Sequence, residues 1–444
     1  ILMPVLERGD IKLIATSTIS DFRRYLQDNE AFMRRFQIIR LEEMNHDGAI
    51  QILEAKAGAI EYRQKVFFSY EALEKAVVLS DKFIHDRYLP AKALSIIQEA
   101  AVMVRKAKGE KKVVTGDDIA QIISEKTKVK VTKITETESG KLLRLEEEIH
   151  ERLINQEEAV KAVSSALRRA RTELRDEEHT IVNLLFLGPT GVGKTELAKQ
   201  VARVYFGSAE NMIRLDMSEY QDISSINRLI GAPPGYAGQG GSPFTEAIRQ
   251  SPFSLLLLDE LEKAHPDVLN VFLQVMDDGR ITDATGRTID FKNVILIATS
   301  NAGTDLIQDG LRHGRSIEAI KQELLERALK SYFRPEFLNR FDGIIVFKPL
   351  SPENVEEIAK LLLQEVAQQM VKKGITLKAT PEAIRELAQA GFDPTMGARP
   401  LKRVVQDRVN DALANFLLTG KLGRRDVAIL EPGGIIRVEK AEEI

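Results

Sequence analysis

The spacing of apolar positions changes near the middle of the chain. Before residue 127 these positions recur at helical intervals, which predict a small helical module with helices at 47–64, 70–86, 91–107 and 116–126. The last helix begins at the cap-like sequence Thr115-Gly116-Asp117. Upstream of the module, the apolar run at residues 11–18 predicts a short buried strand. Residues 127–141 alternate without a broad apolar face and predict a linker that could include one edge strand.

Beyond the linker, short apolar runs alternate with helical patterns. A helical entry at about 142–176 is followed by predicted strands at 181–187, 212–216, 254–258, 293–299 and 343–347. Predicted helices at about 352–373, 381–390 and 397–418 come next, and then short strands near 426–430 and 435–439. The alternation predicts an α/β fold with a doubly wound parallel sheet, closed by a helical small domain that carries short strands.

One motif dominates this second half. Gly188-Pro189-Thr190-Gly191-Val192-Gly193-Lys194-Thr195 fits the phosphate-binding pattern G-x-x-x-x-G-K-[ST] at every fixed position, between a predicted strand and a helix that begins at Glu196. Unpaired N–H groups of the loop and of the helix N-terminus would face the phosphates, and the glycines allow a close approach. We expect Lys194 to reach the β- and γ-phosphates and the Thr195 hydroxyl to hold Mg²⁺. Glu196 is counted with these nucleotide-binding residues.

Two carboxylates follow a second apolar run. The run Leu255–Leu258 suits a central strand, and Asp259 and Glu260 lie at its carboxyl end, where open α/β sheets place their ligands. We expect Asp259 to hold the metal through water and Glu260 to polarise the attacking water. Taken alone, the run could also be a core strand that ends in a solvated turn. Its position downstream of a phosphate loop favours the catalytic interpretation.

Composition narrows the class of protein. A length of 444 residues suggests about two to four domains, and a formal net charge of -3 provides no global basic field for nucleic acid. Cysteine is absent, which excludes disulfides and thiolate metal sites and fits a reducing compartment. The apolar runs are strand-sized, so no membrane span is predicted. The start at Ile1-Leu2-Met3-Pro4 shows no signal peptide and suggests a fragment, and we expect a cytoplasmic location.

An arginine near the end of the predicted sheet indicates the kind of nucleotide enzyme. Arg340 ends a short predicted helix just before the last strand, on a domain edge and far in sequence from the phosphate loop. An arginine there suits action in trans, where it would stabilise charge on the γ-phosphate of a neighbouring subunit. The alternative is a surface arginine paired with Glu336 or Asp342.

With these motifs the sequence resembles the Clp branch of the AAA+ ATPases, the ring-forming unfoldases and disaggregases. The resemblance is close over about 150–440, where Gly188–Thr195 matches the Walker A loop and Leu255–Glu260 the Walker B strand. It implies roles for five further positions: Asn301 as the sensor that orients water, Arg340 as the arginine finger, Arg399 as the second sensor, and Leu153 and Ile154 as residues that pack on adenine.

The same resemblance covers residues 1–126 as the tail of a preceding ring module. Phe32-Met33-Arg34-Arg35-Phe36 resembles its paired arginine fingers, and Asp86–Pro90 opens its helical lid. Its own Walker motifs would lie upstream, so this half is not expected to hydrolyse ATP; a free-standing helical adaptor is the alternative. The implied segments are 1–45 (end of the first large subdomain), 46–126 (its lid), 127–141 (linker), 142–348 (second large subdomain) and 349–444 (small subdomain).

Substrate handling is assigned to the glycine-rich segment Gly231–Gly241. Its glycine density predicts a mobile loop, and Tyr236 resembles the family's pore-loop tyrosine, which grips a translocating polypeptide. The alternative is a surface loop whose tyrosine packs on its own domain. The segment departs from the family at Gln239–Pro243, where bulkier and acidic residues usually stand. Thr282–Thr288 resembles the lower pore loop, with a plain hairpin turn as the alternative.

Two absences narrow the choice within the family. No long heptad-bearing insertion stands between Arg105 and Leu142, and Asp309–Arg315 lacks the apolar-Gly-apolar tripeptide by which protease-coupled members dock, so a peptidase partner is doubtful. The resemblance implies a homo-oligomer, expected to be a hexameric ring, that uses ATP and Mg²⁺ on unfolded or misfolded proteins, with no nucleic-acid or membrane partner. Two rivals are a nucleic-acid loader, suggested by the basic cluster Arg168-Arg169-Arg171, and a non-hydrolysing scaffold, which Glu260 and Arg340 oppose.

Overall fold

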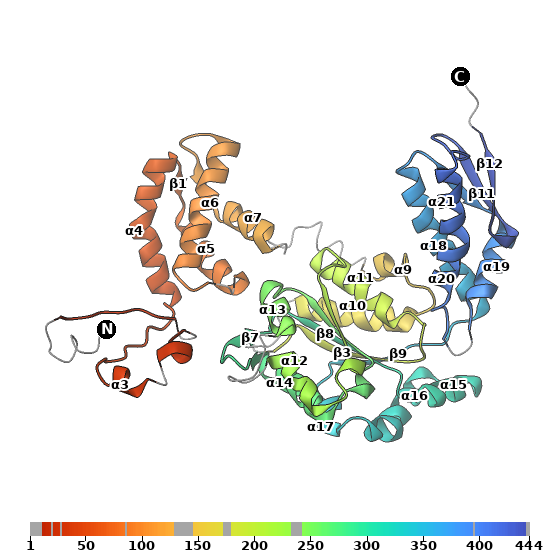
Figure 1. The fold of residues 1–444 in the computed structure, drawn as a ribbon, viewed down its shortest axis with the longest axis horizontal. Coiled ribbons are helices and arrows are strands. Elements are labelled where there is room, and N and C mark those ends of the chain that lie inside the picture. Colours follow the sequence, from red (N-terminus) through yellow and green to blue (C-terminus); the bar gives the residue numbers. More distant parts are fainter. Residues whose placement is uncertain are drawn as a thin grey trace. The chain divides into compact units, whose positions relative to one another are not determined.

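A computed structural model shows how these patterns fold. It describes residues 11–18, 21–26, 29–84, 87–127, 145–171, 179–231, 242–393 and 396–440. The chain forms two compact units, the first built mainly from residues up to 126 and the second mainly from the residues that follow (Figure 1). Among the described residues, no helix has both the length and the apolar character needed to cross a membrane.

The first unit is a helical module. Its helices are η1 (Phe22–Leu26), α3 (Glu30–Met33), α4 (His46–Gln64), α5 (Tyr70–Phe83), α6 (Ala91–Lys108) and α7 (Gly116–Thr127), with the short parallel pair β1 (Phe67–Phe68) and β2 (Val113–Val114). Leu53, Ala76 and Ile97 on α4, α5 and α6 are fully buried and form its core. The four predicted helices are confirmed, and Asp118 caps the last one by accepting a hydrogen bond from the Thr115 N–H (2.9 Å).

The predicted strand at residues 11–18 is wrong. These residues are irregular and exposed, and Ile14 keeps 94% of its surface accessible. No described strand pairs with the segment. An unpaired strand leaves its N–H and C=O groups without a ladder and its apolar side chains without a face to cover, so the apolar run alone does not form a strand here.

The second unit is built on a five-stranded parallel sheet. Its strands are β3 (Val182–Leu187), β4 (Met212–Asp216), β5 (Leu255–Asp259), β8 (Ile295–Ser300) and β9 (Gly343–Val346), in the order β4-β5-β8-β3-β9. All five were predicted. Because every pair is parallel, the carboxyl ends of all five strands meet at one edge, where β5 ends at Asp259 and β8 at Ser300.

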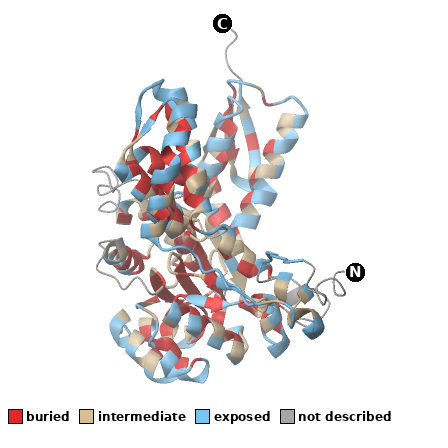
Figure 2. Ribbon diagram, turned by 90° about the vertical axis from the view of Figure 1, so that its left-hand side faces the viewer, coloured by how far each residue is buried: buried red, intermediate tan, exposed pale blue. Residues whose placement is uncertain are grey.

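Helices cover both faces of this sheet. Alternate residues of the central strands, such as Leu185, Leu256 and Leu296, pack in one core with Phe244 of α13 (Pro243–Gln250) and Phe272 of α14 (Pro266–Asp278). The opposite face contacts α10 (Glu157–Arg171) and α11 (Lys194–Phe206). The central strands β3, β5 and β8 are buried on both faces, which explains why their sequences are continuous apolar runs. Figure 2 shows these strands in red.

The remaining elements complete the second unit. The predicted helix at 142–176 is divided into α9 (Leu145–His150) and α10, with Asn155 in the left-handed region between them. The connections include α12 (Ile226–Ile230), α15 (Thr304–Arg312), α16 (Ile317–Glu323), α17 (Pro335–Leu338) and the hairpin β6 (Arg280–Thr282) and β7 (Thr288–Asp290).

The small carboxy-terminal part carries α18 (Pro352–Val371), α19 (Pro381–Gly391), α20 (Leu401–Val405) and α21 (Asp411–Leu418) beside the sheet β10-β11-β12 (Thr376–Ala379, Val427–Glu431, Ile435–Glu439). Strand β10 was not predicted, because four residues with two apolar positions give little signal. The helix predicted from 397 begins four residues later, since Gly397 has a φ of 60° and forms part of a turn.

Candidate nucleotide site

A cleft of about 1080 Å³ opens in the second unit at the carboxyl ends of β4, β5 and β8. It is also lined by α18 and by the turn before α20. The predicted site residues that line it are Leu153, Ile154, Thr190, Gly191, Val192, Gly193, Lys194, Thr195, Glu196, Asp259, Glu260, Asn301 and Arg399. The fold therefore brings together segments that lie up to about 250 positions apart in sequence.

The phosphate loop needs glycine at its tightest points. Gly191 has a φ of 75°, and a Cβ there would lie 2.0 Å from the carbonyl oxygen of Met396. Gly193 has a φ of 105°, and its Cβ would lie 2.8 Å from Leu153 Cδ1. Helix α11 begins directly after the loop, so its unpaired N–H groups and positive dipole end belong to the cleft wall. This is an anion-binding geometry.

Lys194 is buried among neutral acceptors. Its Nζ donates to the carbonyl oxygens of Gly188 (2.5 Å) and Pro189 (2.9 Å) and to Asn301 Oδ1 (2.8 Å). No carboxylate of the described residues forms an ion pair with it. Burial lowers the pKa of Lys194 to about 8, and the negative charges of Glu262, Asp259 and Glu260 offset this only in part. A buried ammonium without a paired carboxylate favours the binding of an anion.

The two carboxylates after β5 lie in different surroundings. Asp259 is nearly buried and accepts hydrogen bonds from Arg214 Nη2 (2.6 Å) and from the Thr299 hydroxyl. The same hydroxyl accepts from the Glu260 N–H (3.2 Å). Glu260 has a φ of 59°, so its side chain leaves the chain in another direction, and its Oε2 lies 2.5 Å from Lys263 Nζ. Each carboxylate is therefore held by a cation of its own.

A third carboxylate connects β5 to the next strand. Glu262 Oε1 accepts a hydrogen bond from the Asn301 N–H (3.2 Å), and its buried Oε2 has no hydrogen-bond partner. The side-chain oxygen of Asn301 in turn accepts the hydrogen bond from Lys194 Nζ. Asn301 is thus held both through its backbone N–H and through its side-chain oxygen, which fixes its orientation as a water-orienting group requires.

Four polar residues of this site were not identified from the sequence: Arg214, Thr299, Glu262 and Lys263. Glu262 and Lys263 stand two and three positions after Glu260, so their proximity could have been read from the motif. Arg214 and Thr299 lie inside strands that are neighbours of β5, and only the strand order brings them to Asp259. The sequence gives no sign of that order.

One end of the cleft is apolar. Leu153 and Ile154 line it together with Ile358, Leu361 and Leu362 of α18. Gln156 fixes the first two, because its buried amide donates to the carbonyl oxygens of Val192 (3.3 Å) and Lys348 (2.9 Å). A flat aromatic base would fit between such walls. The residues of α18 were missed because apolar positions at helical spacing look like ordinary core.

The two predicted arginines of this unit lie in different places. Arg399 lines the cleft, and its turn is joined to the phosphate loop by the hydrogen bond from Ala398 N–H to Gly191 O (3.3 Å). Arg340 is not among the described residues that line the cleft. It pairs with Asp277 (2.5 Å) and keeps 53% of its side chain exposed. The suggested pairing with Glu336 or Asp342 is therefore wrong, because α14 brings Asp277 closer.

The predicted arginines of the first unit are loosely held. Arg34 follows the short helix α3, which has no buried residue, and pairs with Glu30 (3.4 Å) with 79% of its side chain exposed. Arg35 lies in the next turn and is also exposed. The described residues of this unit contain no phosphate loop.

The oxygen donors of the cleft suit magnesium. The Thr195 hydroxyl and the Asp259 carboxylate both line it, and Mg²⁺ prefers oxygen ligands, usually one or two carboxylates with substrate phosphates and water. Among the described residues, no group of three or more His, Cys, Asp or Glu side chains could hold a metal by itself. A magnesium ion here would depend on nucleotide oxygens.

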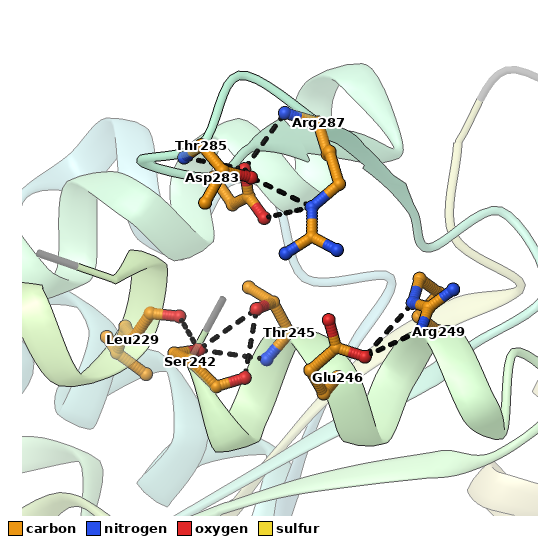
Figure 3. Close-up of polar contacts among 8 residues, drawn as sticks. All are labelled: Leu229, Ser242, Thr245, Glu246, Arg249, Asp283, Thr285 and Arg287. Carbon is orange, nitrogen blue, oxygen red and sulfur yellow. Dashed lines mark hydrogen bonds and ion pairs between the residues drawn. The ribbon is translucent and has the colours of Figure 1, made fainter. Parts of the chain in front are cut away.

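The predicted pore-loop tyrosine, Tyr236, lies outside the described residues. The chain resumes at Ser242, whose hydroxyl donates to Leu229 O and accepts from the Thr245 N–H (3.0 Å), which caps α13 (Figure 3). Helix α13 therefore begins at a well-formed cap.

The predicted lower pore loop is a hairpin turn. It joins β6 to β7, and its centre is the buried Asp283 carboxylate, which accepts from the N–H groups of Thr285 (2.9 Å) and Arg287 (2.9 Å) and from Arg287 Nε (3.2 Å) (Figure 3). Such an Asp-centred turn holds its shape without help from a substrate.

Family models match three parts of the chain. Residues 179–344 match the model described as AAA domain (Cdc48 subfamily), residues 350–429 match the C-terminal, D2-small domain of ClpB protein, and residues 45–152 match the AAA lid domain.

Curated relatives match nearly the whole chain. A ClpA homolog from Cyanidium caldarium, described as an ATP-dependent Clp protease ATP-binding subunit, is 38% identical to this chain. The alignment covers 97% of this chain and 59% of the relative. ClpC from Staphylococcus epidermidis is also 38% identical, and its alignment covers 98% of this chain and 61% of the relative. The chain thus spans about three-fifths of the relatives it matches. The first alignment extends over 504 positions, more than the 444 of this chain, so that relative contains stretches without a counterpart here.

Solved structures agree. The S. cerevisiae Hsp104-ADP complex matches with a TM-score of 0.81, and Hsp104 with ATPγS and FITC casein matches with a TM-score of 0.78. Each is 35% identical and covers 98% of this chain and 76% of the other.

Proposed function

Because the chain belongs to the Clp/Hsp100 family of AAA+ ATPases, we propose that it is an ATP-dependent protein unfoldase, which threads polypeptide through the pore of a hexameric ring. The observation that carries this proposal is the convergence of Lys194, Glu260, Asn301 and Arg399 on one cleft with an apolar end. The division into a first-module part and a second module, with the boundaries given above, is part of the proposal.

Each residue of the cleft has its own role in ATP hydrolysis. The phosphate loop, residues 188–195, cradles the phosphates with its N–H groups, and Lys194 moves from the loop carbonyls to the β- and γ-phosphates. Thr195 and Asp259 would hold Mg²⁺, Asp259 through water, and the ion would neutralise phosphate charge. Glu260 accepts the proton of the attacking water. Asn301 orients that water, and Arg399 stabilises the transferred phosphoryl group.

The base and the neighbouring subunit complete the site. Leu153 and Ile154 pack on adenine. Arg340 acts in trans, because it is half exposed, lies outside the cleft of its own chain and has a planar fork of donors that matches a γ-phosphate. Arg34 and Arg35 would play the same part in the preceding ring.

Protein is the proposed substrate, gripped by Tyr236. One solved relative, Hsp104, is described with casein, and that description supports a protein substrate here. The rival, a nucleic-acid loader, loses support because Arg168 pairs with Glu146 (2.7 Å) and the net charge is -3. A cytoplasmic location is proposed as well. A peptidase partner is left out, because Asp309–Arg315 lacks the docking tripeptide.

The first experiment tests hydrolysis. Glu260→Gln removes the base and leaves Lys194, Thr195 and Asp259 in place, so the variant should bind ATP like the wild type and turn it over at least ~100-fold more slowly. Steady-state turnover and equilibrium binding of a fluorescent ATP analogue measure the two effects. Unchanged turnover would refute the assignment of Glu260.

The second experiment tests action in trans. Arg340→Ala and Lys194→Ala subunits should each be inactive alone, and mixed rings should recover part of the activity, because an intact cleft then meets an intact arginine. No recovery in hetero-oligomers shown to assemble would contradict the role of Arg340.

The third experiment tests what the energy moves. In assembled rings, Tyr236→Ala should keep most ATPase activity and unfold a tagged model protein much more slowly, because only the contact with substrate is lost. Tyr62→Ala is the control, since Tyr62 is a tyrosine on α4 with 90% of its surface exposed. DNA-stimulated hydrolysis together with normal unfolding by Tyr236→Ala would favour the nucleic-acid rival.

A further inference from the structure

Lys263 is the cation that contacts the proposed catalytic base. It lies in the short turn after β5, three residues beyond Glu260, and its Nζ is 2.5 Å from Glu260 Oε2. The hydrogen bond that the ammonium donates to Glu260 and the nearby charges of Glu260, Glu262 and Asp216 raise the pKa of Lys263, so the ammonium stays charged at neutral pH. The pair therefore persists as an ion pair under working conditions.

The direction of this contact matters. Glu260 lines the cleft, whereas Lys263 is not among the described residues that line it. The ion pair consequently turns one carboxylate oxygen of Glu260 toward a cation outside the place where water must be activated. An oxygen that already accepts a short charged hydrogen bond has less capacity to accept a proton from water.

The backbone around Glu260 does not require the pair. The turn is fixed independently, by the bond from the Glu260 N–H to the Thr299 hydroxyl and by the bond from the Lys263 N–H to Glu260 O (3.0 Å). The buried side chain of Leu261 anchors it as well. Removal of the Lys263 ammonium should therefore free the carboxylate without unfolding the turn.

We propose that Lys263 is a positioning residue that holds Glu260 in a resting orientation and so restrains ATP hydrolysis until the pair opens. The inference rests on the proposed function, since it needs Glu260 to be the base. Both side chains are partly exposed, 27% for Glu260 and 46% for Lys263, so the restraint is modest. Exposed pairs of this kind shift an equilibrium by roughly two- to fivefold.

The first test compares three variants of the full chain. Lys263→Met should raise kcat for ATP by about two- to fivefold with little change in KM, because binding groups are untouched. Lys263→Arg keeps the charge and should stay near the wild type. Lys360→Met is the control: Lys360 is also 46% exposed and forms the same kind of pair with Glu357, three residues apart (2.6 Å), and neither residue is among the described ones that line the cleft.

The second test observes the pair itself, without hydrolysis. In nucleotide-free protein, Glu260→Gln should lower the pKa of Lys263 and speed its acylation by an amine-reactive reagent several-fold, whereas Lys360 should be unaffected. Mass spectrometry of the labelled peptides gives both rates in one sample.

The outcomes separate this inference from the proposed function. A wild type that hydrolyses ATP, with a Lys263→Met variant of equal or lower kcat, overturns the restraint. Unchanged acylation of Lys263 in Glu260→Gln overturns the pair. A wild type without ATPase activity, or a Glu260→Gln variant as fast as the wild type, instead refutes the assignment of Glu260.

Discussion

Two lysines are buried among the described residues, one in each unit, and only one of them has carboxylate partners. Lys92 of the first unit forms ion pairs with Asp81 (2.7 Å) and Glu43 (3.2 Å). Burial by itself would raise the pKa of Asp81, but hydrogen bonds from Lys92 and His46 outweigh it and lower that pKa. Lys194 of the second unit has only carbonyl and amide oxygens as partners, and burial lowers its pKa to about 8.

The difference separates a structural cation from a binding one. Lys92 joins α6 to α5 and to the segment before α4, and its charge is fully used within the fold. The charge of Lys194 is surrounded by neutral oxygens only, and the residue lies at the start of helix α11 and lines the cleft. A phosphate would supply the negative charge that the fold withholds. The same residue type therefore stabilises one unit and prepares the other for a ligand.

The largest expected effect comes from replacing each lysine by methionine. Lys194→Met should weaken ATP binding by roughly 100-fold, because charged hydrogen bonds to phosphate are lost, and should leave the melting temperature nearly unchanged. Lys92→Met should do the reverse. It should leave ATP binding intact and destabilise the first unit by about 1–3 kcal/mol, since two carboxylates lose their partner.

Calorimetric measurement of ATP binding and thermal unfolding of both variants check that Lys194→Met loses binding and Lys92→Met loses stability. The cost for Lys92 stays below that of a fully buried pair because Asp81 and Glu43 keep 38% and 34% of their side chains exposed. If both variants lost stability and neither lost binding, Lys194 would be a structural cation like Lys92.

The next effect concerns the shape of the loop around Lys194. Gly191→Ala should weaken ATP binding by about tenfold or more, because its Cβ would collide with Met396 O and push the loop away from the turn that carries Arg399. Gly207→Ala is the matched control. Gly207 also has a positive φ (84°), but its Cβ would meet no atom within 4 Å. Equal binding by the two variants would show that the collision at residue 191 does not weaken ATP binding.

The two lysines also show what a sequence can and cannot predict. Lys194 was identified because its motif fixes the spacing of glycine, lysine and threonine, and the five strands were identified because buried parallel strands are continuously apolar. Lys92 gave no signal, since its partners Asp81 and Glu43 come from other segments. The contacts of Arg340 escaped for the same reason, because only the folded chain brings Asp277 to it. Strand β10 escaped because its four residues give little periodic signal.

A smaller effect should follow from the Thr299 hydroxyl, which joins the Asp259 carboxylate to the backbone N–H of Glu260. Thr299→Val keeps the shape of a β-branched strand residue but removes the bonds to Asp259 and to the Glu260 N–H. We expect kcat to fall by about three- to tenfold with little change in KM, at a cost of about 1 kcal/mol in stability. Steady-state kinetics and thermal unfolding measure both, and an unchanged kcat would mean that the carboxylates are positioned without Thr299.

The most direct test of the central claim measures protons. With a pKa of about 8, free Lys194 is only about one-quarter charged at pH 8.5, and a bound phosphate would raise its pKa toward the ordinary value. ATP phosphates are already fully ionised at this pH. Titration of ATP in magnesium-free buffers of different ionisation enthalpy should therefore reveal uptake of roughly 0.7 proton per site. That uptake should vanish in Lys194→Arg, if it binds, and shrink as the pH falls to 7. Binding without proton uptake at pH 8.5 would contradict the claim that Lys194 is a buried cation awaiting an anion.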